Sequence, residues 1–140
     1  MRYTDDDWCF GCGSQNPIGL HMEFDQTEDG VKGIFVPQRN HQGYRGMLHG
    51  GLMMTLLDEA LAWAVTVKYG PGVTGELRTR IRRLGEIGKP LTVIGRVTGK
   101  RLRMVEGESA ILDPTGAIVA QATGKFMLSD DPNISAGLRR

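Results

Sequence analysis

The alternation of apolar and polar positions places strand-like segments on both sides of one long helical segment. Residues 51–67 contain no proline and no internal glycine. Apolar side chains recur there three and four positions apart, at Leu52, Leu56, Ala60, Trp63 and Val67. This spacing is the period of an α-helix. Because apolar residues continue around most of the circumference, the pattern predicts a central helix that is covered on several sides.

The remaining apolar segments are short and resemble strands. Two precede the helix, at residues 19–26 and 30–37, and four follow it, at residues 73–83, 91–100, 102–112 and 117–128. Turn-forming residues between the first two segments predict a hairpin, and similar clusters separate the last four. An antiparallel meander is the simplest connection among these strands.

This order of elements favours an α+β fold. Two strands, one helix and four strands do not alternate as a parallel sheet requires. The pattern predicts a curved antiparallel sheet of five or six strands that wraps the long central helix, which is preceded by a polar, glycine-rich loop at residues 38–48. We expect an N-terminal loop segment at residues 1–18, the folded domain at residues 19–129 and a flexible tail at residues 130–140.

The composition fits one domain without a general affinity for polyanions. The chain has 140 residues, 40% of them hydrophobic, and its 17 Lys and Arg nearly balance its 16 Asp and Glu. A chain with so small a net charge is not expected to attract nucleic acid or an anionic membrane. The first 19 residues lack the apolar core of a signal peptide. We therefore expect a cytoplasmic protein with neither nucleic-acid nor membrane partners.

The only two cysteines, Cys9 and Cys12, form a C-x-x-C pair within CFGCG. A zinc site would need further ligands, which we expect only the three histidines, His21, His41 and His49, to supply. A redox pair usually opens a helix, whereas turn-forming residues surround this pair. The sequence favours a tight loop with small packed thiols, and we expect neither a metal nor a cofactor.

One acidic residue, Asp58, lies in the middle of the apolar helix. Burying a carboxylate is unfavourable unless it is paired, hydrogen-bonded or protonated, so a chain that keeps one there usually has a use for it. Asp58 is seven residues after Gly51, about two turns, and faces nearly the same side. The adjacent Glu59 points about 100° away. We predict that Asp58, rather than Glu59, faces a functional pocket.

The helix begins with His49, Gly50 and Gly51. Backbone N–H groups at a helix start lack partners within the helix and can receive an anion, and glycine lets a ligand approach closely. Gly50 and Asp58 are about 12 Å apart along the axis, too far for one reacting group to contact both. If both act together, they belong to different chains of a two-fold dimer with antiparallel helices.

Three motifs extend over about residues 8–128: CFGCGSQNPIGL, then GYRGMLHGGLMMTLLDEA, then VTGELRTRI followed by GKPL. Together they resemble the hotdog-fold thioesterases, in particular the PaaI-like group of the phenylacetate pathway. The resemblance implies an acyl-CoA thioesterase that works as a homodimer or homotetramer. In it, Asp58 would act as general base or nucleophile, and the Gly50 amide, next to His49 and Gly51, would hold the oxyanion.

The resemblance also points to supporting residues, with one departure. Many PaaI-like proteins carry an asparagine six residues before the histidine of the HGG motif, and this chain has Gly43 there. Gln42 is the nearest polar substitute, and Asn40 and His41 belong to the same loop. Thr74 matches a position where the family often has serine or threonine near the nucleophile. A hydroxyl there would position water, although a strand threonine is more often structural.

Arginines of the segment after the helix offer contacts for the phosphates of coenzyme A. Residues 73–83 alternate between an apolar face, which we expect to cover the helix, and a charged face that includes Arg78 and Arg80. Arg101 is expected nearby in the sheet. Guanidinium groups bind phosphate and stack on adenine. The alternative is that these charges only solvate an exposed strand.

Two functions are therefore considered. The first is an acyl-CoA thioesterase that uses Asp58 and the Gly50 amide. The second is a protein that binds acyl-CoA without hydrolysing it, as a sensor or scaffold, because fold does not fix function. Gly43 in place of the asparagine favours the second function, whereas the acid and the HGG motif favour the first.

Overall fold

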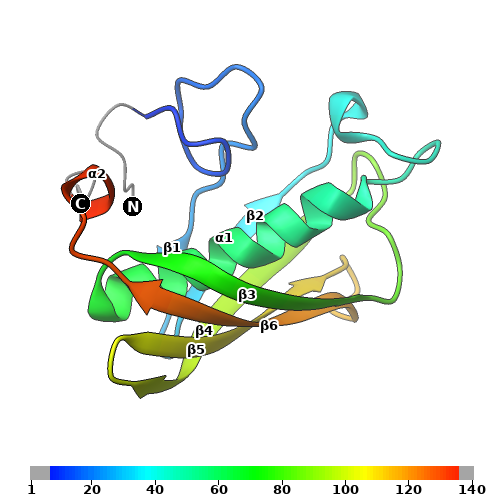
Figure 1. The fold of residues 1–140 in the computed structure, drawn as a ribbon. Helices are drawn as coiled ribbons and strands as arrows, with labels where there is room; N and C mark the ends of the chain where they lie inside the picture. Colours follow the sequence, from blue (N-terminus) through cyan, green and yellow to red (C-terminus); the bar gives the residue numbers. More distant parts are fainter. Residues whose placement is uncertain (1–6, 136–140) are drawn as a thin grey trace.

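One long helix lies against a curved antiparallel sheet (Figure 1). The computed structural model describes residues 7–135 of the chain. In chain order the elements are β1 (Asp25–Gln26), β2 (Val31–Phe35), the 3-10 helix η1 (Arg39–His41), α1 (Gly50–Tyr69), β3 (Gly72–Ile81), β4 (Leu91–Arg101), β5 (Met104–Leu112), β6 (Ile118–Leu128) and α2 (Pro132–Ser135). The α+β class, the single long helix and the six strands agree with the expectation from sequence.

The first hairpin is confirmed, but its first strand is much shorter than predicted. β1 pairs with β2 in antiparallel register, with Asp25 opposite Lys32. Residues 19–24 show the apolar alternation of a strand, and Leu20 and Met22 are buried. Their N–H groups, however, bond to carbonyls of the N-terminal loop instead of a strand, at 2.8 and 2.9 Å. The alternation of apolar residues in this segment therefore reflects burial of side chains and not pairing of strands.

The sheet order is β1-β2-β4-β5-β6-β3, so the predicted meander is only partly correct. β4, β5 and β6 follow one another as hairpins, whereas β3 pairs with β6, with Leu77 opposite Gly124. Residues 82–90 carry the chain from β3 across to β4. That connection is longer than an ordinary hairpin loop, which has about two to five residues. β3 consequently lies at an edge of the sheet.

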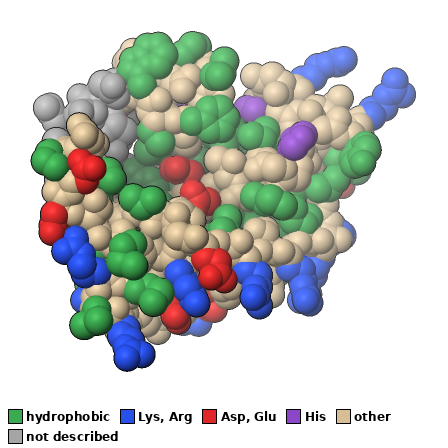
Figure 2. Space-filling view, in the orientation of Figure 1, with side chains coloured by type: hydrophobic (Ala, Val, Ile, Leu, Met, Phe, Trp, Pro, Cys, Tyr) green, Lys and Arg blue, Asp and Glu red, His purple; other side chains and the backbone are tan. Residues whose placement is uncertain are grey.

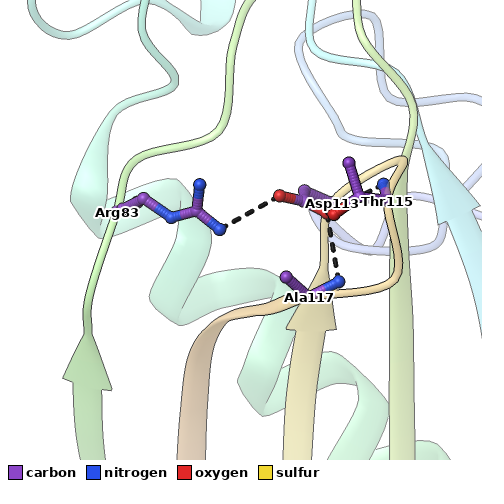
Figure 3. A network of polar contacts seen from close by, with 4 residues as sticks. All are labelled: Arg83, Asp113, Thr115 and Ala117. Atoms are coloured by element: carbon purple, nitrogen blue, oxygen red, sulfur yellow. Dashed lines mark hydrogen bonds and ion pairs between the residues drawn. The ribbon is translucent and has the colours of Figure 1, made fainter.

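The crossing segment is fastened to the β5–β6 turn by a polar network (Figure 3). Arg83 donates to Asp113 Oδ2 at 3.1 Å. The other carboxylate oxygen, Oδ1, accepts from the backbone N–H groups of Thr115 at 2.9 Å and Ala117 at 3.1 Å. The Thr115 hydroxyl and these N–H groups, with Arg83, hold the pKa of Asp113 below its usual range. The carboxylate thus closes its own turn and anchors the end of β3.

The central helix α1 packs very closely on the sheet. It is long and apolar enough to cross a membrane by length and composition alone, but eight of its residues are buried within the fold. Gly95 of β4 faces it, and a Cβ there would overlap the backbone of Ala60; one at Gly107 of β5 would lie 2.8 Å from the Leu61 side chain. The Ser109 hydroxyl donates to the Leu57 carbonyl at 2.9 Å. Small residues beneath α1 therefore fix its position.

Replacing Gly95 with alanine tests this close approach. Because the added methyl group would meet the Ala60 backbone and not a movable side chain, Gly95→Ala should reduce the free energy of unfolding by about 1–3 kcal/mol. Gly99→Ala is the matched control in the same strand, since nothing lies within 4 Å of its Cβ position. Urea unfolding of both variants makes the comparison. Equal stabilities would contradict the close packing of α1.

Candidate active site

The start of α1 leaves one backbone donor available. The ring of His49, the N-cap residue, accepts a hydrogen bond at Nδ1 from the Gly51 N–H at 2.9 Å. The next two N–H groups bond to the His49 carbonyl. No acceptor among the described residues receives the N–H of Gly50. Gly50 is half-buried, and a Cβ on it would lie no closer than 3.7 Å to Ile81. A free donor at a helix start suits an anionic oxygen.

Asp58 is half-buried on α1 and is held by β3. The Thr74 hydroxyl donates to its Oδ1 at 2.7 Å. A bulge between Thr74 and Glu76 interrupts the register of β3 with β6 beside this contact. Burial raises the pKa of Asp58, and the Thr74 hydrogen bond opposes that rise only in part. No buried side-chain oxygen of the described residues lacks a partner. The second carboxylate oxygen, for which no partner is seen, is therefore open to solvent.

The loop before α1 is held by contacts within itself. Gln42 accepts a hydrogen bond from the Gly46 N–H at 2.9 Å. His41 accepts from the Gln38 N–H at Nδ1, and its ring packs on Phe35 with centroids 5.1 Å apart. Asn40 is exposed. The Gln42 side chain is thus engaged in its own turn and is not directed at the start of α1.

Gly43 lies directly against the N-cap residue. A Cβ at this position would be 3.0 Å from the His49 Cα. This contact is tight, and the neighbouring atom belongs to the backbone. A side chain at the place where PaaI-like proteins carry an asparagine would therefore require a small shift of the His49 backbone. The departure in sequence is matched by a local shape that accepts only glycine without adjustment.

The arginines do not share a face with Asp58 within one chain. Arg78 and Arg80 are exposed on β3 and line a groove of about 770 Å³ on the outer side of the sheet, with Lys32 and Arg96. Leu77, between them and Thr74, faces the core instead. Arg101 is exposed at the last position of β4. A contact between these arginines and a ligand at Asp58 would require a second chain.

Glu59 was assigned no function from sequence, yet it is more deeply buried than Asp58. Its carboxylate and the sulfurs of Cys9 and Cys12 all lie within 4.8 Å of one another. Burial, followed by the nearby charges of Cys9 and Asp58, raises the pKa of Glu59 to about 8. The two consecutive acids therefore face opposite neighbours, Asp58 towards β3 and Glu59 towards the N-terminal loop.

The face of the molecule that carries α1 is mixed in character. In Figure 2, histidine side chains lie towards the end where α1 begins, acidic side chains lie near the middle, and apolar side chains surround both. Several large apolar side chains are exposed in the described chain, among them Met47, Met54 and Val73.

Several solved structures with the same architecture are thioesterase superfamily proteins. No protein-family model and no curated protein matches the sequence. One thioesterase superfamily protein superimposes with a TM-score of 0.83 at 24% identity, over 91% of this chain and 67% of that chain. The chain has the hotdog fold.

Two other hotdog proteins of known structure are informative. The PaaI protein from the E. coli phenylacetic acid degradation operon has a TM-score of 0.72 at 20% identity, covering 78% of this chain and 84% of its own. A hypothetical thioesterase from Streptococcus pneumoniae, solved with coenzyme A, has a TM-score of 0.70 at 23% identity, covering 85% and 91%. At these identities the likeness establishes the fold of this chain.

The N-cap role of His49 can be measured directly. His49→Ala removes the acceptor for the Gly51 N–H and should lower the free energy of unfolding by about 0.5–2 kcal/mol. Asparagine is a strong N-cap residue, so His49→Asn should recover most of that loss. Chemical unfolding followed by circular dichroism provides the comparison. Equal destabilisation by both substitutions would show that the cap hydrogen bond contributes little.

Proposed function

We propose that this protein is an acyl-CoA thioesterase that hydrolyses a thioester to a carboxylic acid and free coenzyme A. The observation that carries the proposal is the pair of groups on α1: a free Gly50 N–H at its start and a half-buried Asp58 held by Thr74. One is a donor for a developing oxyanion and the other is a carboxylate with an open oxygen. A hotdog thioesterase solved with coenzyme A supports the substrate class.

The two groups act together only across a homodimer. They are eight residues apart on one helix, about 12 Å along its axis. β3, which contacts both regions, pairs on one side with β6 and has no strand partner on its other edge among the described residues. Thr74, near the start of β3, touches Asp58, and Ile81, at its end, lies nearest to Gly50. Antiparallel pairing of two β3 edges would bring these opposite ends together.

The proposed reaction uses each group once. The thioester oxygen accepts the Gly50 N–H of one subunit, which favours attack at the carbonyl carbon. Asp58 of the partner subunit acts in one of two ways. It removes a proton from the attacking water, or it attacks the carbon itself and forms a mixed anhydride as the C–S bond breaks; water then hydrolyses the anhydride and supplies the proton to the thiolate. In the first route, the tetrahedral intermediate collapses, the C–S bond breaks and the thiolate takes from Asp58 the proton that came from water. Because the pKa of Asp58 is raised, this carboxylate is a stronger base than that of an exposed aspartate.

A non-catalytic acyl-CoA-binding protein is the second candidate. Gly43 favours it, because PaaI-like proteins carry an asparagine there and Gln42, the nearest polar residue, is bonded within its own turn. The two candidates differ in one measurable property. A thioesterase releases free thiol from acyl-CoA, whereas a binding protein retains the thioester intact.

Asp58→Asn tests the carboxylate. Thiol release from short, long and aromatic acyl-CoAs should show a substrate for the native protein, and the variant should lose about 10²- to 10⁴-fold in kcat on it. Asparagine preserves the size of the side chain and can still accept from Thr74, so the fold should persist by circular dichroism. Undiminished turnover by the variant would reject the assignment of Asp58. Binding of acyl-CoA by the native protein without turnover would favour the second candidate.

Gly50→Pro tests the backbone donor. Gly50 is the first residue of α1 and His49 before it has φ −59° and ψ 132°, so proline fits there while removing the N–H. We expect kcat to fall about 10²- to 10³-fold. Gly50→Ala is the matched control, because it keeps the N–H and its Cβ has room. Retention of activity by Gly50→Pro would exclude this amide as the oxyanion donor.

Mixing the two inactive variants tests the shared site. In a dimer of one Asp58→Asn chain and one Gly50→Pro chain, one of the two composite sites combines the intact Asp58 with the intact Gly50. After random exchange, half of the dimers carry one intact site, so about a quarter of native activity should return. Sites contained within one chain would recover none. If no activity returns although mass spectrometry shows that the subunits have exchanged, the composite site is rejected.

A further inference from the structure

The N-terminal loop brings its two cysteines onto Glu59 of α1. Cys12 is buried, Cys9 is half-buried, and both are free. Their sulfurs and a Glu59 carboxylate oxygen all lie within 4.8 Å of one another. In a tetrahedral zinc site, bonds of about 2.3 Å to sulfur and 2.0–2.2 Å to oxygen place ligand atoms roughly 3.5–3.8 Å apart. The cluster therefore needs only small side-chain movements to bind one ion.

The N-terminal loop closes tightly around the Cys9 side chain. A turn closes over it through the hydrogen bond from the Gly13 N–H to the Cys9 carbonyl at 2.8 Å. The backbone N–H groups of Gly11, Cys12 and Gly13 are directed at the Cys9 sulfur. The thiolate is the form of cysteine that binds metals.

Glu59 enters the same loop through a gap left by glycine. A Cβ at Gly11 would overlap the Glu59 carboxyl group, so a side chain there would displace that carboxyl group from the loop. Cys12 and Trp63 donate hydrogen bonds to the carboxylate. None of the ion pairs among the described residues involves Glu59 or either cysteine. The cluster thus gathers groups that can carry negative charge, with no lysine or arginine of residues 7–135 paired to them.

We propose that Cys9, Cys12 and Glu59 bind one thiophilic divalent cation, Zn²⁺ in the experiment below. The two sulfurs and one carboxylate oxygen give three protein ligands, and the exposed side of Cys9 leaves a fourth position for water. The ion neutralises the charge that gathers there and links the N-terminal loop to α1. The link lies one residue from Asp58 and so helps to fix the rotation of the helix there.

The three histidines that the sequence offers as further zinc ligands do not belong to this cluster. His21 is bonded through Nε2 to the Asn16 carbonyl at 2.6 Å. His41 accepts the Gln38 N–H at Nδ1, and His49 accepts the Gly51 N–H at Nδ1 as the N-cap of α1. The third ligand is instead an acid 47 positions after Cys12, as the numbering of the two residues gives. Only folding brings it to the loop.

A disulfide between Cys9 and Cys12 is the competing use of the pair. It would engage both sulfurs but would remove the Cys12 thiol from the buried Glu59 carboxylate, to which it donates. Burying a carboxylate with fewer donors is unfavourable. A metal ion engages all three groups at once, which makes it the better match to the observed cluster.

The test is a titration of the reduced, metal-free, full-length protein with Co²⁺ followed by Zn²⁺. We expect one Co²⁺ per chain, a thiolate-to-cobalt charge-transfer band in the absorption spectrum, and loss of that band on adding one equivalent of Zn²⁺. The thermal midpoint should rise with Zn²⁺, because an ion that binds only the folded chain stabilises it. Absence of the charge-transfer band in the native protein would overturn the proposal, as would recovery of a Cys9–Cys12 disulfide that takes up no metal.

Three variants locate the site. Cys12→Ser should lose the charge-transfer band of the two-thiolate site, and Glu59→Gln should keep thiolate absorption but bind at least about tenfold more weakly. Asp58→Asn is the matched control, since it alters the neighbouring carboxylate on the same helix and should bind Zn²⁺ like the native protein. Equal binding by Cys12→Ser would place the metal elsewhere and reject the site. If Cys12→Ser fails to fold, the Zn²⁺ affinities of Glu59→Gln and Asp58→Asn are compared with each other. Equal affinities of these two variants would contradict the proposal.

Discussion

The close contact between α1 and the sheet is the constraint on which the rest of the structure depends. Gly95 and Gly107 leave room for Ala60 and Leu61, and the Ser109 hydroxyl holds the Leu57 carbonyl. These contacts fix how far the helix lies from the sheet and how it is rotated. Once that rotation is set, the direction of every other side chain on α1 follows, because successive residues of a helix are about 100° apart.

The two acids of α1 show how much depends on that rotation. Asp58 points to the edge strand β3, where Thr74 binds one oxygen and solvent reaches the other. Glu59 points to the N-terminal loop, where burial raises its pKa to about 8. Two adjacent carboxylates of similar chemistry are thereby assigned different environments. The first suits proton transfer or attack on a substrate, and the second suits binding a cation.

The position of β3 connects the fold to the proposed activity. As an edge strand it carries Thr74 near its start and Ile81 at its end, beside the two groups of α1 that one chain holds apart. The sequence predicted this strand and its alternating faces but placed it next to β4. The turn residues before β4 are compatible with a hairpin or with a crossing segment, and local preferences do not distinguish these, whereas the length of the connection favours crossing.

Much of the fold and part of the site followed from the sequence. The long helix, the glycines at its start, the later strands and the resemblance to hotdog thioesterases were readable because they depend on local spacing and turn chemistry. Three features could not be read from the sequence. They are the hydrogen bond of Gln42 within its own turn, the groove that Arg78 and Arg80 line, and the contact of Glu59 with Cys9 and Cys12. The sequence by itself determined the elements and placed two acids side by side on α1. Only the tertiary structure decided what each acid faces, because helix rotation and strand order depend on packing between residues far apart in the chain.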